Sequence, residues 1–434
     1  MSTPPAPTAS ASADLHRVVD AVWRMESARI VGALTRVTGD VGLAEELAQD
    51  ALVAALEQWP ESGVPAKPGA WLMAIAKHRA IDTFRRAQNL RRKTEELGRD
   101  LVEGVEEDWA AALDEVVEDD VLRLVFISCH PVLSREARVA LTLRLVGGLT
   151  TDEIARAFLV PEKTLAQRIV RAKRTLTAAR VPFEMPTGDD FTARLSSVLE
   201  VLYLVFNEGY AATAGEDLTR PALCQEAMRL GRILAGLVPG EPEVHGLVSL
   251  MELQASRLAA RTGPDGQSVL LANQDRGRWD RVLITRGLAA LDRAEQSAAG
   301  ALGPYALQAS IAACHARPRS VEGTDWAAIA GSYEALAALT PSPVVELNRA
   351  VAVSRAYGPA AGLELVDGLR DVPALAGYHL LPAVRGDLLV QLDRHAEAGE
   401  EFERAASLTR NERERALLLG RAADCRGRAG LPTA

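Results

Sequence analysis

The sequence predicts an all-α protein, and three observations support this. Aromatic residues make up only 4% of the 434 residues, and runs of β-branched residues are few. Along most segments, apolar residues recur at spacings of three and four, which is the period of an amphipathic helix. Stretches containing proline and glycine separate these segments. A chain of this length can form two to four domains.

The charge and the cysteines exclude several classes of protein. The net charge of −9 argues against a protein that coats nucleic acid indiscriminately, so any DNA contact must come from local basic patches. The four cysteines form no CxxC pair, and no histidines stand at ligand spacing. We therefore expect buried thiols in a reducing compartment, with no disulfide, no metal site and no cofactor. No apolar run reaches membrane-spanning length and no signal peptide is evident, which predicts a cytoplasmic protein without a membrane partner.

The segment TTDEIARAFLVPEKTLAQRIVRAKRTL, residues 150–176, predicts a helix-turn-helix. Thr151 can cap the first helix, and Glu153 lies in its first turn, where the helix dipole favours an acid. Pro161 cannot donate a backbone hydrogen bond and therefore marks the break before the second helix. One apolar face is expected in that second helix, made of Leu165, Ile169, Ala172 and Leu176.

A polar stripe is expected on the opposite side of the second helix, made of Lys163, Gln167, Arg171 and Arg174. Arginine and lysine can bond guanine, glutamine can bond adenine, and the remaining positive charges can meet phosphates. The alternative is a solvated basic face on an ordinary helical hairpin. From this stretch alone, DNA binding is the favoured interpretation.

An acidic face is predicted on a helix nearer the N-terminus, Leu43–Trp59. Glu46, Gln49 and Asp50 lie together on one side of it, with Glu45 nearby. Read as an isolated helix, this pattern indicates only a solvated surface.

A basic helix is predicted after a loop at residues 60–68. Its stripe at helical spacing consists of Trp71, His78, Asp82 and Arg85. Seven Lys/Arg against one Asp between Trp71 and Lys93 give a local charge of +6. Aromatic rings among cations can stack on unpaired bases and hold backbone phosphates. The alternative is a buried tryptophan beside a basic surface.

Two polar segments frame these helices. Residues 1–13 are rich in Pro, Ala and Ser, which predicts a disordered tail, and helices are expected from Asp14 and from near Ser27. Between Glu95 and Asp120 stand twelve Asp/Glu against one arginine, and the first half of this run is predicted to be a flexible linker.

The order of these parts resembles the bacterial sigma factors of the extracytoplasmic-function (ECF) class. DVGLAEELAQDALVAALEQW resembles their core-polymerase-binding helix, and PGAWLMAIAKHRAIDTFRR their promoter-melting and −10-reading segment. LSREARVALTLRLVGGLTTDEIARAFLVPEKTLAQRIVRAKRTL resembles their −35-reading domain. The resemblance covers about residues 14–180, in the family's order, with an acidic linker that would lie in a basic channel of the polymerase.

The resemblance implies roles for three sets of residues. Glu45, Glu46, Gln49 and Asp50 would form the acidic surface that docks on core RNA polymerase. The −10 single strand would be handled by Trp71, His78, Arg79, Asp82, Arg85 and Arg86. The −35 duplex would be read by Lys163, Thr164, Gln167, Arg168, Arg171 and Arg174. His78 departs from the family pattern, because many members have asparagine there.

About 250 residues follow the helix-turn-helix, after a short linker at residues 181–187. A helix is predicted through Leu195, Val198, Leu199 and Leu202 into YLVFNEGYAAT, with Gly209 ending it in a left-handed conformation. Further helices are predicted at residues 222–237, 243–261 and 278–298. The polar run NQDRGRWDR invites a catalytic interpretation, but no nucleophile–base pair or phosphate-cradling glycine loop accompanies it, so no enzymatic role is predicted.

A repeat at an offset of 36 residues emerges from about residue 325. Arg349 matches Arg385, and Ala350 matches Gly386. Small residues at close helix crossings and a period near 34 residues are typical of tetratricopeptide repeats, which form interaction surfaces. The whole arrangement resembles the ECF sigma factors that carry a C-terminal tetratricopeptide-like extension.

We therefore expect five parts. These are a disordered tail (1–13), sigma region 2 (14–93), an acidic linker (94–118), sigma region 4 (119–180) and a helical extension (190–434). The expected function is promoter-specific transcription initiation with core RNA polymerase, without enzymatic chemistry, controlled by an extension that packs on the sigma domains and can carry a protein partner. The alternatives are a conventional helix-turn-helix regulator with the repeats as sensor, and a scaffold that binds only proteins, which would leave both basic segments unexplained.

Overall fold

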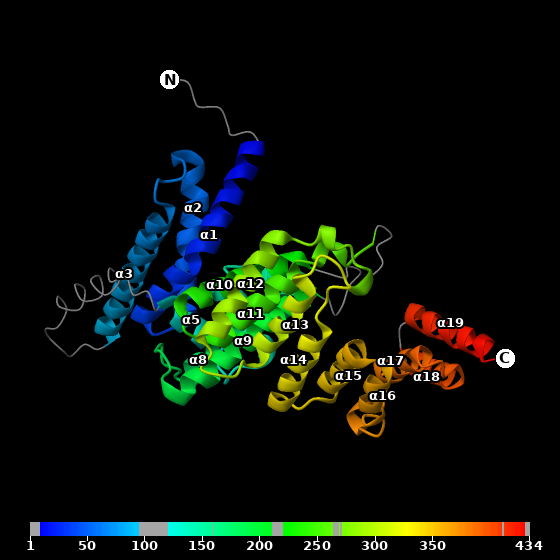
Figure 1. Cartoon of the computed structure of the whole chain (residues 1–434). Helices are drawn as coiled ribbons and strands as arrows, with labels where there is room; N and C mark the ends of the chain where they lie inside the picture. Colours follow the sequence, from blue (N-terminus) through cyan, green and yellow to red (C-terminus); the bar gives the residue numbers. More distant parts are fainter. Residues whose placement is uncertain are drawn as a thin grey trace. The chain divides into compact units, whose positions relative to one another are not determined.

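A computed structural model describes residues 9–94, 120–158, 160–210, 220–263, 269, 271–409 and 412–429. These residues form α-helices and short 3-10 helices, and no β-sheet is present among them, which confirms the predicted all-α fold (Figure 1). The chain divides into two compact units, Met1–Leu237 and Val238–Ala434. The acidic linker predicted for residues 94–118 lies almost wholly outside the described residues.

The first unit begins with a three-helix bundle of α1 (Ala9–Thr38), α2 (Val41–Ser62) and α3 (Pro68–Thr94). The two helices expected from Asp14 and Ser27 are one continuous helix, α1, which also includes the last residues of the predicted tail. The loop predicted from Pro60 begins later, because Pro60 is accommodated in the last turn of α2. Gly63, with φ of 78°, ends that helix in a conformation that suits glycine.

The helix-turn-helix follows in the same unit. Its two helices are α7 (Thr151–Phe158) and α8 (Glu162–Ala178), and they are preceded by α5 (Asp120–Ser128) and α6 (Arg135–Leu145). The four helices α5–α8 together are called the helix-turn-helix half. The cap of α7 differs from the prediction: Thr150, not Thr151, accepts a hydrogen bond from the Glu153 backbone N–H at 3.1 Å. The Glu153 carboxylate accepts in return from the Thr150 N–H at 2.8 Å, which completes a capping box.

The first two helices of the extension, α9 (Gly188–Tyr210) and α10 (Pro221–Leu237), also belong to the first unit. They pack on each other, and α9 packs on α5 and α6. Gly209 is not a left-handed cap, contrary to the prediction. It is buried in α9, and a Cβ there would lie 2.7 Å from the backbone nitrogen of Cys224, so glycine permits the close approach of α10.

The second unit is a succession of helices, each packed on its neighbours in the chain. They are α11 (Pro242–Ala255), α12 (Arg281–Ser297), α13 (Pro304–Ala316), α14 (Trp326–Leu339), α15 (Pro343–Tyr357), α16 (Pro359–Asp367), α17 (Leu380–Gln391), α18 (His395–Leu408) and α19 (Glu412–Arg428). The predicted helices at 243–261 and 278–298 are shorter than expected.

Two helix pairs, α15–α16 and α17–α18, lie where the 36-residue repeat predicts them. Their crossings are close, as the small residues indicate. A Cβ on Gly386 would lie 2.7 Å from the ring of Phe402, and one on Gly362 would lie 2.9 Å from the carbonyl oxygen of Ala350.

The NQDRGRWDR run has a structural role in the second unit. Asp275 accepts a hydrogen bond from the Gly277 N–H at 2.8 Å, and Asp280 caps α12 by accepting from Val282 and Leu283. Arg276 is buried and donates to the carbonyl oxygens of His315, in the last turn of α13, and Pro318, just beyond it, at 2.8 and 2.9 Å. These contacts give Asp275, Arg276 and Asp280 structural roles.

Candidate nucleic-acid interface

The second helix of the helix-turn-helix, α8, presents the two faces that the sequence predicts. Its apolar stripe is buried, from Leu165 at 1% exposed to Ile169 at 5%. Arg168 is half-buried, and the other predicted −35 residues are exposed: Lys163, Thr164, Gln167, Arg171 and Arg174. Within the described part of the chain, no ion pair engages the four cations of this set. The charges of Lys163, Arg171 and Arg174 are therefore available to an external anion, whereas Arg168 also interacts electrostatically with Glu136.

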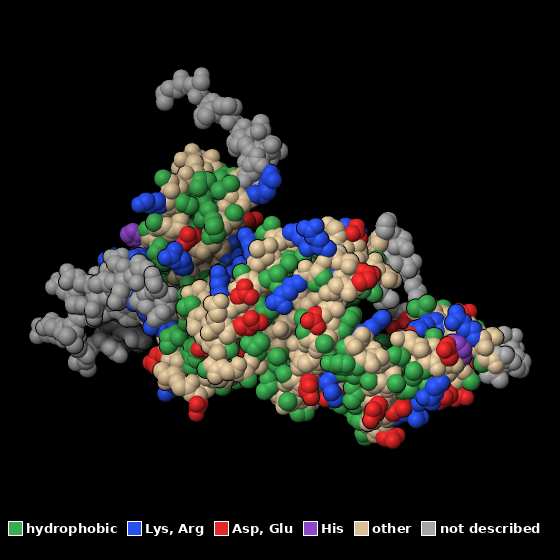
Figure 2. Space-filling view, in the orientation of Figure 1, with side chains coloured by type: hydrophobic (Ala, Val, Ile, Leu, Met, Phe, Trp, Pro, Cys, Tyr) green, Lys and Arg blue, Asp and Glu red, His purple; other side chains and the backbone are tan. Residues whose placement is uncertain are grey.

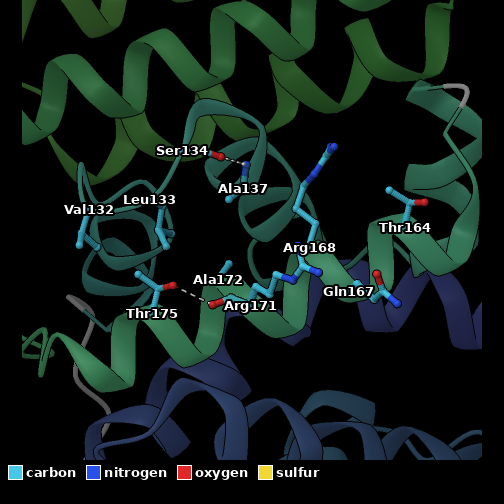
Figure 3. Close-up of a pocket in the computed structure, with 10 residues that line it drawn as sticks. All are labelled: Val132, Leu133, Ser134, Ala137, Thr164, Gln167, Arg168, Arg171, Ala172 and Thr175. Carbon is cyan, nitrogen blue, oxygen red and sulfur yellow. Dashed lines mark hydrogen bonds between the residues drawn. The ribbon is translucent and has the colours of Figure 1, made fainter.

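A groove of about 380 Å³ runs between the start of α6 and α8 (Figure 3). On one side lie residues 132–137, where Ser134 caps α6 by accepting from the Ala137 N–H at 3.3 Å. The opposite side carries four of the predicted −35 residues, Thr164, Gln167, Arg168 and Arg171. Part of the polar stripe of α8 thus lines an open groove on the protein surface.

The predicted −10 residues lie on α3. Trp71 is half-buried, and its ring meets that of Trp59 edge-on, with 5.4 Å between ring centroids. The remaining predicted residues are exposed: His78, Arg79, Asp82, Arg85 and Arg86. Trp71 is therefore part of the bundle core and part of the surface, so both interpretations of this ring hold in part.

The predicted polymerase-binding face of α2 contains an apolar component that the sequence prediction missed. Glu46 and Asp50 are exposed, and Gln49 is half-buried. Val53 and Leu56, one and two turns further along the same side, are 50% and 38% exposed. Figure 2 shows hydrophobic side chains on the surface in the area of α1 and α2. The sequence contained this signal, because Gln49, Val53 and Leu56 follow Glu46 at i+3, i+7 and i+10.

Glu45 does not belong to this exposed face, although the sequence groups it there. It is 5% exposed, and its Oε1 accepts a hydrogen bond from Nε of Arg144 on α6 at 2.6 Å. Its Oε2 forms an ion pair with Lys173 on α8. One step along a helix turns the side chain by about 100°. Glu45 therefore faces the helix-turn-helix while Glu46 faces solvent.

Further contacts join the N-terminal bundle to the helix-turn-helix half. Arg24 on α1 pairs with Glu153 at 2.5 Å. Arg36, also on α1, pairs with Asp120 at 2.9 Å, and that carboxylate is almost fully buried. In this conformation the regions predicted to read −10 and −35 DNA are packed against each other.

The extension contacts the helix-turn-helix half through α9. Ser197 donates to the carbonyl oxygen of Cys129 at 2.7 Å, and Arg138 on α6 contacts both Ser197 and Glu200. Burial raises the pKa of the Cys129 thiol to about 11, so this side chain is a neutral part of the core.

All four cysteines, Cys129, Cys224, Cys314 and Cys425, are buried and free, as predicted. Among the residues that the structure describes, no cluster of three or more His, Cys, Asp or Glu side chains has the arrangement of a metal site. None of the helices described is long and apolar enough to span a membrane.

Comparison with known proteins identifies the parts of the chain. Residues 22–90 match the family described as Sigma-70 region 2, and residues 123–176 match Sigma-70, region 4. Residues 194–295 match a family of unknown function, DUF6596. No solved structure matches the chain.

Two kinds of relative are found among curated proteins. An uncharacterized protein of Rhizobium meliloti is 45% identical over 390 residues, which cover 89% of this chain and 91% of that protein. The ECF RNA polymerase sigma factor SigK of Mycobacterium ulcerans is 30% identical over 155 residues, 34% of this chain and 78% of SigK. The probable ECF RNA polymerase sigma factor SigI of Mycobacterium tuberculosis is 27% identical over 171 residues, 38% of this chain and 57% of SigI. The chain therefore belongs to the ECF RNA polymerase sigma factors.

Proposed function

We propose that this protein directs core RNA polymerase to specific promoters and initiates transcription there, under the control of its own C-terminal extension. The observation that carries the proposal is the division of α8 into a buried apolar stripe and an exposed cationic stripe beside a groove. An ordinary solvated hairpin would need the buried apolar stripe but not the exposed cationic stripe. Membership of the ECF sigma factors does not favour the alternative of a conventional regulator.

The −35 duplex would be read by α8. Arg168 and Arg171 border the groove and can form bidentate hydrogen bonds with guanine, while Gln167 can do so with adenine. Lys163 and Arg174, at the two ends of the stripe, would meet phosphates and set the orientation of the helix.

The −10 strand would be handled by α3. Trp71 is half-buried, so the accessible part of its ring can stack on an unpaired base while the ring also contacts Trp59. The exposed His78, Arg79, Arg85 and Arg86 would hold the backbone of the separated strand, with Asp82 among them.

Core polymerase would dock on α2. Glu46 and Asp50 supply negative charge, and the exposed Val53 and Leu56 supply apolar area on the same side. An interface with an apolar centre and complementary charges around it is the common arrangement in protein complexes. A role for Glu45 in docking would first require its release from Arg144 and Lys173.

Reading both promoter elements requires the packed arrangement to open. Elements about 25 base pairs apart are separated by roughly 85 Å of B-DNA, at about 3.4 Å per base pair. In the structure Glu45 of α2 contacts Lys173 of α8 directly. The chain between α3 and α5, residues 95–119, can permit the separation, because its covalent reach at full extension is about 85 Å.

The extension would act as the regulator, and its repeats would hold a protein partner. Support for regulation comes from α9 and α10, which belong to the same compact unit as the DNA-reading helices. The proposed role needs no cofactor and places the protein with the polymerase in the cytoplasm.

The test is reconstituted transcription with core enzyme and a library of promoter fragments. A sigma factor confers run-off transcription on core polymerase at a subset of fragments and has little affinity for duplex DNA alone. Tight, sequence-specific binding to duplex without core enzyme, combined with no run-off product, would establish the conventional regulator instead.

A further inference from the structure

The turn between α6 and α7, residues 146–149, is held from two sides. All four of its residues are buried, and Gly148 has φ of 70°. A Cβ on Gly148 would lie 2.7 Å from the hydroxyl of Ser27 on α1. A Cβ on Gly147 would lie 3.1 Å from the Glu226 carboxylate on α10. The turn is therefore clamped between the N-terminal bundle and the extension.

From the extension side, Arg229 on α10 contacts the backbone of this turn. Its guanidinium donates to the carbonyl oxygens of Gly147 and Val146 at 3.3 and 3.5 Å. Nη2 of the same guanidinium also donates to Oε1 of Glu226 at 2.7 Å. These carbonyls follow the end of α6, where unpaired oxygens and the helix dipole favour a cation.

From the bundle side, Arg144 connects the turn to α2. Its Nη1 donates to the carbonyl oxygen of Leu149 at 3.1 Å, and its Nε donates to Glu45 at 2.6 Å. The same side chain thus spans the turn and holds the buried carboxylate that joins α2 to the helix-turn-helix. A buried carboxylate depends strongly on its cations, because losing one leaves an uncompensated charge.

We infer that residues 146–149 form a coupling turn through which the extension controls the opening of the two sigma domains. Arg229 fixes the turn, the turn positions Arg144, and Arg144 retains Glu45 in the closed arrangement. Arg144 and Arg229 are positioning residues in this scheme, and neither touches DNA or polymerase. The chain continues from α10 directly into the second unit at Val238.

This inference deepens the proposed function, because opening matters only if both promoter elements are read. Its test is made on the free full-length protein, without DNA or polymerase. Two fluorophores are placed through non-natural amino acids at the exposed positions Glu61, at the end of α2, and Ala179, just after α8. Energy transfer between the two fluorophores reports the closed fraction. Because the labels are attached to non-natural amino acids, the buried cysteines stay unlabelled.

The variants form a double-mutant cycle. Glu45→Gln should raise the ratio of open to closed protein by about tenfold or more, since it removes a buried charge from two cations. Arg229→Met should raise it by roughly threefold to tenfold. In the Glu45→Gln background, Arg229→Met should have little further effect, because the two changes act on one connection. The matched controls, Glu57→Gln on α2 and Gln225→Met on α10, should leave the ratio unchanged.

Two outcomes overturn the coupling. One is an unchanged closed fraction in Arg229→Met, and the other is full additivity of the two substitutions. If Glu45→Gln does not fold by circular dichroism, Lys173→Met replaces it and removes one cation from the same carboxylate. Failure of run-off transcription would refute the proposed function and leave this measurement unaffected, so the two failures are distinguishable.

Discussion

Arg220, immediately before α10, donates a hydrogen bond to the carbonyl oxygen of Ala157, near the end of α7. Its guanidinium also pairs with Glu208 on α9 at 2.6 Å. The extension therefore supports the first helix of the helix-turn-helix. The compact unit that contains the helix-turn-helix ends at Leu237, and not at the linker of residues 181–187.

Two truncations should consequently behave differently. A protein that ends at Leu237 retains α9 and α10, and we expect it to unfold cooperatively. A protein that ends at Pro186 exposes the faces of α5 and α6 that α9 covers, and we expect a lower melting temperature and weaker −35 binding. Thermal unfolding by circular dichroism and transcription by each protein measure this. Equal stability of both truncations would show that α9 and α10 do not support the helix-turn-helix.

Replacing Arg171 with alanine should weaken binding to −35 duplex by about 1–3 kcal/mol, if the side chain makes a bidentate guanine contact. The loss should depend on the base pair at one position of the promoter. Arg180→Ala, which removes the same charge beyond the end of α8, is the matched control. Unaltered promoter selectivity in a folded Arg171→Ala protein would remove this residue from the reading surface.

Replacing Trp71 tests promoter opening. Leucine is preferable to alanine because it retains an apolar contact with Trp59, whose ring lies 5.4 Å from that of Trp71. Loss of one stacked base should cost roughly 1–3 kcal/mol of open complex. Permanganate reactivity of the −10 thymines measures opening, and thermal unfolding checks stability. Full reactivity in a stable Trp71→Leu protein would limit Trp71 to the core.

Stability of the second unit should depend on pH through His315. Its pKa is lowered to about 4 because the ring is buried, with Arg257 and Arg276 adding repulsion, whereas the unfolded chain titrates near 6.5. The neutral ring thus stabilises the folded state above pH 6.5, and this contribution is lost as the pH falls from 6.5 towards about 4. The loss should be about 1–3 kcal/mol in urea unfolding. His315→Gln should flatten this dependence and His78→Gln should not. An equal slope in all three proteins would contradict the assignment.

The parts that were predictable from sequence are those that a local pattern determines. The stripes of α8 follow from residues three and four apart, so Leu165 and Arg171 could be placed on opposite faces. The burial of Glu45 could not be foreseen, because one of its cations, Arg144, is 99 residues away in the chain. The prediction of a left-handed cap at Gly209 is wrong for a similar reason: the backbone that approaches this glycine belongs to a different helix, α10.

Reversing the charge at Glu46 and Asp50 should abolish the capture of core polymerase while preserving the helical circular-dichroism signal. Both side chains are exposed, so lysine there introduces no buried charge. Asp20→Lys together with Glu61→Lys makes the same change of net charge at other exposed positions and should retain capture. A separate change, Val53→Ser with Leu56→Ser, should weaken capture with less dependence on salt, because it removes apolar area and leaves the charge intact. If the Glu46→Lys, Asp50→Lys protein captures core enzyme as strongly as the wild type, this face of α2 is an ordinary solvated surface.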